Sequence, residues 1–163
     1  MTTKRITLTG LVAALYFVLT VCLPFPAYGE IQFRLSEVLN LLAFINPAFA
    51  PGLILGCFAA NIFSSVNPVF DCIFGTLSTA LTMLYVVKFS KNLLIASLWP
   101  VVFCVIIGGM IMFTSGLAWS LFTFASITGS VMAGELAVMI LVGYPLFKYL
   151  MRNEKLITYL RSL

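Results

Sequence analysis

Three carboxylates are the side chains of this sequence best suited to holding a ligand: Glu37, Asp71 and Glu135. Glu135 stands deep within a long apolar segment, and no basic residue lies within a helical turn of it. A carboxylate at such a depth costs free energy and marks a functional site by default. Because a carboxylate presents two acceptor oxygens side by side, several of them in an apolar pocket favour a cation or a flat ligand rich in hydrogen-bond donors.

A polar stretch at residues 28–37 separates two apolar segments and carries two acids, one arginine, one glutamine and two aromatics. We interpret it as the lid and one wall of a small-molecule site, with ligand-binding roles for Tyr28, Gln32, Phe33, Arg34 and Glu37. Arg34, if buried, needs an anionic partner, and Glu30, Glu37 and Asp71 are available. A solvated loop arginine is the alternative, and Glu37 could instead only cap a helix N-terminus.

The composition places these residues in a membrane protein. Of the 163 residues, 62% are hydrophobic and 9% are charged, and the mean hydropathy is +1.13. A soluble domain carries about 25% charged residues, so an integral membrane protein is the class that fits. The net charge of +4 does not indicate nucleic-acid binding, because the basic residues stand at the chain ends and in one short connection. We expect no metal and no cofactor, since histidine is absent and the four cysteines lack ligand spacing.

The hydropathy pattern predicts an all-α bundle of six transmembrane helices in a single domain, residues 1–163. The apolar segments are residues 6–23, 35–65, 71–87, 93–113 and 124–146. The second is interrupted by Asn46-Pro47 and Pro51-Gly52 and is counted as two short helices. Short, broken segments point to a membrane binding site, although an ordinary helical hairpin would also explain the prolines.

Basic residues set the predicted orientation. The positive-inside rule places Lys4 and Arg5, Lys88 and Lys91, and the basic C-terminal segment in the cytoplasm, with both termini inside. The outer side then receives residues 28–37, Asn67 with Asp71, and the loop around Trp119. Asp71 also begins a small or polar stripe that suits either a wet pocket or close helix packing: Asp71, Gly75, Ser78 and Thr82. Tyr28, Phe33, Phe70 and Trp119 could stack on a flat ring or anchor the chain at the interface.

The first helix carries small residues. Gly10 and Ala14 form a small-xxx-small pair, which lets another helix approach closely within lipid. The approaching helix could come from the same chain or from a partner protein.

Several of these segments resemble the QueT family, which comprises substrate-binding S components of energy-coupling factor (ECF) transporters. The resemblance rests on Tyr28-Gly29-x-Ile31-Gln32-Phe33-Arg34-x-Ser36-Glu37, on Asp71-x-x-Phe74-Gly75-Thr76-x-x-Thr79, and on Glu135 ahead of Gly143-Tyr144-Pro145-Leu146. It implies a multi-pass protein of a prokaryotic plasma membrane that takes up queuosine precursors, deazaguanine bases such as pre-queuosine, and is not itself an enzyme.

The same resemblance implies partner proteins, namely a transmembrane coupling subunit and two cytoplasmic ATPases. It places docking on the coupling subunit at Gly10, Ala13 and Ala14, where the pattern is GxxxA rather than AxxxA. The charge argument, not the resemblance, assigns the ligand-binding residues: Glu135, Glu37, Asp71, Arg34, Gln32, Phe33, Tyr28 and Asn67.

Other functions compete with this interpretation. An S component for another vitamin-like solute is the nearest, and a secondary transporter that moves protons through Glu135 is a second. An intramembrane enzyme is disfavoured, because the acids come with no nucleophile, histidine or metal-ligand spacing. A scaffold protein would not need costly acids within its spans. The chain also lacks a Gly-Lys-Ser/Thr phosphate loop for hydrolysing ATP itself.

Overall fold

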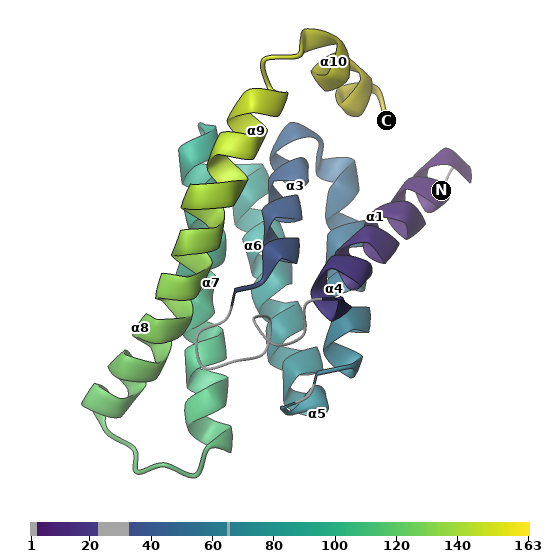
Figure 1. The fold of residues 1–163 in the computed structure, drawn as a ribbon. Helices are drawn as coiled ribbons and strands as arrows, with labels where there is room; N and C mark the ends of the chain where they lie inside the picture. Colours follow the sequence, from purple (N-terminus) through teal and green to yellow (C-terminus); the bar gives the residue numbers. More distant parts are fainter. Residues whose placement is uncertain (1–2, 23–32, 65) are drawn as a thin grey trace.

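Helices and short connections make up the chain in this computed structural model, which describes residues 3–22, 33–64 and 66–163 (Figure 1). No strand occurs within those ranges, so the predicted all-α class is confirmed. The first elements are α1 (Thr3–Val21), the 3₁₀ helix η1 (Leu35–Leu41), α3 (Leu42–Ile45), η2 (Pro47–Phe49) and α4 (Ala50–Ile62). The remainder are α5 (Pro68–Phe70), the π-helix η3 (Asp71–Gly75), α6 (Thr76–Phe89), α7 (Leu93–Thr114), α8 (Leu121–Ala137), the π-helix η4 (Val138–Gly143), α9 (Tyr144–Leu150) and α10 (Glu154–Ser162).

Among the described residues, three continuous helices are long and apolar enough to cross a membrane: Pro68–Phe89, Leu93–Thr114 and Leu121–Leu150. The first two have 22 residues each, about 33 Å at 1.5 Å per residue, against a hydrocarbon core of about 30 Å. Three shorter apolar helices accompany them: Arg5–Val21, Leu35–Ile45 and Pro47–Ile62. The number of crossings therefore stays a prediction.

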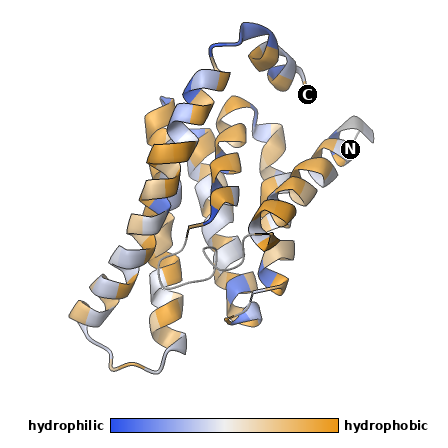
Figure 2. Cartoon of the chain, viewed as in Figure 1, coloured by the Kyte–Doolittle hydropathy of each residue, from blue (hydrophilic) through white to orange (hydrophobic). Residues whose placement is uncertain are grey.

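The helices form one bundle in which α4 contacts α1 and α6, and α7 contacts α6 and α8 (Figure 1). The start of α1, the end of α10 and the connection from α6 to α7 lie at one end of the bundle, and the loop from α7 to α8 lies at the other (Figure 1). Hydrophobic residues cover the long helices, whereas hydrophilic residues gather at α10 and the turn before it (Figure 2). This pattern is typical of a bundle whose sides face lipid.

The predicted break at Asn46-Pro47 is confirmed. Asn46 is extended (φ −148°, ψ 117°), as the residue before a proline prefers, and it ends α3. Its side-chain oxygen accepts a hydrogen bond from the backbone N–H of Ala48 at 3.0 Å, which caps the next turn. Its amide nitrogen donates to the carbonyl of Leu160 in α10 at 2.9 Å. The sequence reading did not foresee α10, which packs Ile157 onto this end of the bundle.

The second predicted interruption, Pro51-Gly52, is wrong. Pro51 occupies the first turn of α4, and the helix runs through Gly52 without a break. Proline is tolerated there because the N–H groups of the first turn have no intrahelical acceptor. Residues 47–62 are therefore one helix.

Two glycines of α4 allow α1 to pack closely against it. A Cβ atom added at Gly56 would lie 2.7 Å from the carbonyl oxygen of Ala13 and 2.8 Å from the Cβ atom of Tyr16. One added at Gly52 would lie 2.8 Å from the carbonyl oxygen of Thr9. The small-residue motif used within the chain is thus Gly52-xxx-Gly56, whereas a Cβ at Gly10 would meet nothing within 4 Å.

We therefore predict opposite effects of alanine at Gly56 and Gly10. Gly56→Ala forces α1 away from α4 and lowers the free energy of unfolding by about 1–3 kcal/mol. Gly10→Ala has free space and improves helix propensity by up to about 1 kcal/mol. Thermal unfolding of the purified variants in detergent, followed by circular dichroism, measures the difference. Equal melting temperatures would contradict the tight α1–α4 contact.

Candidate ligand-binding site

A small cavity lies inside the bundle where η1, η3, α6, α7 and α8 meet. Its volume is about 20 Å³. Its charged lining comes from two places in the fold: Arg34 immediately precedes η1, Glu37 lies within η1, and Glu135 lies on α8. The rest of the lining is small, hydroxylated or apolar: Gly75, Ser78, Thr79, Thr82, Pro100, Cys104, Ile107 and Val131.

The 3₁₀ form of η1 explains why Arg34 and Glu37 point to the same place. A 3₁₀ helix has three residues per turn, so side chains three positions apart stand one above the other. Arg34, Glu37 and Asn40 follow this spacing, and all three are buried. The amide of Asn40 donates a hydrogen bond to Glu37 Oε2. This turn therefore presents a guanidinium and a carboxylate to one cavity.

Glu135 approaches the same cavity from α8. It is 4% exposed, and its Oε1 accepts no hydrogen bond from any residue that the structure describes. Thr128, seven residues earlier on α8, and Met139, four residues later in η4, are buried too. A buried carboxylate oxygen without a donor is costly. The arrangement therefore suits a ligand that supplies the donor.

Arg34 is buried, which excludes the solvated loop arginine. Its Nη2 donates to Asn61 Oδ1 at 3.1 Å. Asn61 is fully buried and donates through Nδ2 to Cys57 Sγ at 3.4 Å. A Cβ atom at Gly75 would stand 2.6 Å from Asn61 Nδ2, so only glycine leaves room for this asparagine. An α4 side chain thus orients the arginine of η1.

The polar stripe predicted along residues 71–82 is divided in the structure. Gly75, Ser78 and Thr82 line the cavity, so this part of the stripe serves the pocket. Asp71 does not line it, and its Oδ2 instead accepts a hydrogen bond from Ser64. Asn67, one turn earlier, contributes its backbone carbonyl to the start of this helix and does not line the cavity either.

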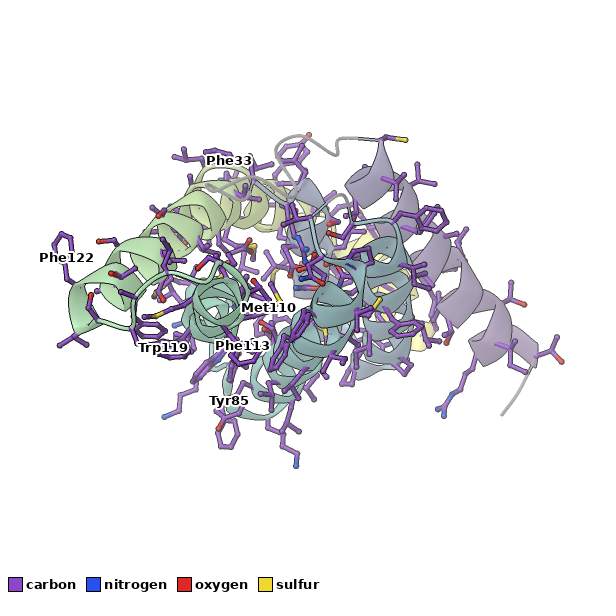
Figure 3. The ribbon with its side chains drawn as sticks, turned by 90° about the horizontal axis from the view of Figure 1, so that it is seen from below. Phe33, Tyr85, Met110, Phe113, Trp119 and Phe122 are labelled. Atoms are coloured by element: carbon purple, nitrogen blue, oxygen red, sulfur yellow. The ribbon has the colours of Figure 1, made fainter. Side chains whose placement is uncertain are left out.

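The aromatic residues proposed to stack on a ligand lie outside this cavity. Phe33 is 42% exposed and Trp119 is 72% exposed. Viewed from the end that carries the α7–α8 loop, Trp119 and Phe122 lie at the edge of the bundle and Met110 lies inside it (Figure 3). Phe70 stacks on Phe74, with ring centroids 6.1 Å apart. Tyr28, Gln32 and Glu30 fall outside the described residues.

The sequence reading missed two residues that organise the cavity. Tyr16 of α1 donates a hydrogen bond to Glu37 Oε1, and Asn61 holds Arg34. Each is a hydrogen-bonding residue within an apolar segment, and that was the available signal. The stronger patterns in these segments are the small residues of α1 and the prolines of α4, and neither pattern indicates which distant side chain a tyrosine or an asparagine contacts.

The charged groups of the cavity suit a ligand that donates hydrogen bonds. Two carboxyl groups and one guanidinium face a space that holds about one water molecule. Ligand pockets are larger, about 300–1,000 Å³, so a bicyclic ring enters only when these walls move apart. Two acids against one base favour a ligand that is cationic or rich in donors.

Comparison with known proteins identifies the family. The family model described as QueT transporter matches residues 6–152. The chain belongs to the QueT transporter family. Residues 6–152 include every helix that packs around the cavity, so the family match and the site concern the same part of the chain.

A curated relative is 44% identical over 79 residues, which cover 47% of this chain and 46% of the relative. It is the queuosine precursor transporter QueT of Lactococcus lactis subsp. cremoris (strain MG1363). The aligned part thus spans about half of that relative's length. No solved structure matches the chain. As a member of a transporter family with several apolar helices, this QueT chain is a multi-pass protein of the cell membrane.

The orientation of Arg34 gives a testable prediction for this QueT protein. Asn61→Leu removes an acceptor of the buried Arg34 Nη2 and lowers the free energy of unfolding by about 1–3 kcal/mol. Asn67→Leu is the control, because the side chain of Asn67 caps no helix. Thermal unfolding in detergent measures the melting temperature of each variant against that of the unchanged chain. A loss for Asn67→Leu as large as that for Asn61→Leu would contradict the role of Asn61.

Proposed function

We propose that this chain is the substrate-binding S component of an ECF-type transporter and takes up queuosine precursors, deazaguanine bases such as pre-queuosine. The observation that carries the proposal is the pair of buried carboxyl groups, Glu37 and Glu135, lining one cavity together with Arg34. A deazaguanine base has adjacent ring N–H and amino donors, and the aminomethyl form also has a cationic arm. One carboxylate can accept the paired donors and the other can accept the ammonium.

The family match supports this substrate class. The Lactococcus relative is named as a queuosine precursor transporter, and the two sequences align over residues that make up about half of each chain. In the proposed topology the chain crosses the membrane six times with both termini in the cytoplasm. The common position of the two ends in Figure 1 is consistent with an even number of crossings. ATP is hydrolysed by partner ATPases in this proposal.

We predict that Glu135→Gln weakens binding of pre-queuosine by about 10-fold or more, because it removes a charge-assisted hydrogen bond worth about 1.5–3 kcal/mol. Calorimetry on the purified chain measures the dissociation constant. Glu154→Gln is the matched control, since Glu154 is exposed on α10 and does not line the cavity. Undiminished affinity of the Glu135 variant would refute its role in binding.

Partner docking is proposed for the exposed face of α1, which points away from the rest of the bundle. Leu8, Val12, Tyr16 and Thr20, spaced four residues apart, form its buried face. Gly10 and Ala14 are exposed and out of phase with these residues by two positions, about 200° around the helix. Ala13 instead packs its backbone against Gly56 of α4. Docking on a coupling subunit therefore uses Gly10 and Ala14, which leave room for a close helix.

Leucine at Gly10 tests this docking face. Gly10→Leu removes the space for a partner helix, so we expect the chain to lose co-purification with the coupling subunit and to keep its affinity for pre-queuosine. Ala133→Leu on α8, at another exposed position, is the control and retains the partner. Retention of the partner by Gly10→Leu would show that docking uses another face.

A proton-coupled secondary transporter is the second candidate, and the buried Oε1 of Glu135 favours it, because a carboxyl group without a donor can carry a proton. Uptake of radiolabelled precursor by cells distinguishes the two. We expect uptake to require the coupling subunit and the ATPases, and to persist when an uncoupler collapses the proton gradient. Uptake that survives loss of the ATPases and stops with the uncoupler would establish the second candidate.

A further inference from the structure

The carboxylate of Glu37 is held on both oxygens by residues outside the cavity. Tyr16 Oη donates to Oε1, and Asn40 Nδ2 donates to Oε2. Glu37 lines the cavity, whereas Tyr16 and Asn40 do not. Both donors are fully buried, with exposed fractions of 0%. The two contacts therefore reach Glu37 from the protein side and leave the cavity side open.

We propose that Tyr16 and Asn40 are positioning residues for ligand binding, which act by fixing the orientation of the Glu37 carboxylate. This inference rests on the proposed function of the cavity. A carboxylate has about four acceptor sites, so a donor on each oxygen leaves one site on each oxygen for a ligand. A carboxylate fixed before binding does not have to be ordered by the ligand, and that increases affinity.

The two contacts come from different parts of the fold. Asn40 follows Glu37 by one turn of the 3₁₀ helix, so its position is set locally. Tyr16 lies on α1, 21 residues away in sequence, and its Cβ atom is placed by the close approach of α1 to Gly56. The packing of α1 against α4 thereby positions the hydroxyl group of Tyr16, and this hydroxyl group contacts the Glu37 carboxylate at the cavity.

The contrast with Glu135 separates the roles of the two acids. Glu135 Oε1 accepts no hydrogen bond from the described residues, so the ligand is its donor. Glu37 is held at both oxygens before any ligand arrives. Glu37 therefore provides a fixed acceptor pair suited to the rigid edge of a ring, and Glu135 provides an acceptor that can adjust to a flexible group.

Tyr16→Phe tests the proposal, because it removes only the hydroxyl group. A second hydrogen bond between the same two elements, from Thr20 Oγ1 to Ser36 Oγ at 2.7 Å, supplies a matched control. Thr20 is buried like Tyr16, but its hydroxyl contacts neither Glu37 nor the cavity. Thr20→Val therefore measures how much the affinity for the ligand falls when the contact between α1 and η1 is weakened without any change at Glu37.

Calorimetry with pre-queuosine gives dissociation constants for each purified variant. We expect Tyr16→Phe to weaken binding about 5- to 10-fold, the effect of one lost hydrogen bond, and Thr20→Val to change it less than about 2-fold. Asn40→Ala removes the other donor and should weaken binding as Tyr16→Phe does. In a chain that already carries Glu37→Gln, Tyr16→Phe should weaken binding by less than about a further 2-fold, because the effects of substitutions at residues in direct contact are not additive.

Equal losses for Tyr16→Phe and Thr20→Val would overturn the positioning role, as would a full additional loss on the Glu37→Gln background. Weakened binding by Glu37→Gln with wild-type affinity for both Tyr16→Phe and Asn40→Ala would overturn this inference and leave the proposed site intact. Undiminished binding by Glu37→Gln itself would overturn both the inference and the assignment of Glu37 to the ligand.

Discussion

The burial of charge inside an apolar bundle is the constraint on which the rest of this structure depends. Lipid offers no hydrogen bonds, so each buried charged group needs a partner within the protein or in a ligand. Arg34 uses Asn61, and Glu37 uses Tyr16 and Asn40. These partners come from α1, η1 and α4, so the hydrogen bonds of the charged residues connect three elements.

Close helix packing makes these hydrogen bonds possible. Gly52 and Gly56 bring α1 onto α4, and this places Tyr16 beside Glu37. Gly75 leaves the space that Asn61 occupies beside Arg34. The glycines of α4 and η3 therefore act on the site indirectly, by letting polar side chains reach groups that would otherwise be buried without partners. If the cavity is the proposed ligand site, a substitution at one of these residues is expected to change both the free energy of unfolding and the affinity for the ligand.

Sequence reasoning succeeded where a local rule decides the structure. The turn at Asn46 follows from the restriction that proline imposes on the preceding residue, and the burial of Glu135 follows from the cost of exposing a carboxylate to lipid. It failed where the partner is distant in sequence, as for Tyr16 with Glu37 and Gly56 with Ala13. Asp71 lies outside the cavity, and the π-helical turn η3 that begins at this residue changes the helical register relative to α6, which the residue spacing does not reveal.

In the function proposed here, Glu37 and Glu135 bind opposite parts of one ligand in the cavity between η1, α6, α7 and α8. An experimental structure of the purified chain with bound pre-queuosine measures this most directly. We expect the ring to lie between the two carboxylates, in a cavity wider than the present one of about 20 Å³, with Tyr16 still hydrogen-bonded to Glu37. A ligand bound elsewhere, with the cavity unchanged and neither carboxylate in contact with it, would refute the binding roles of both acids.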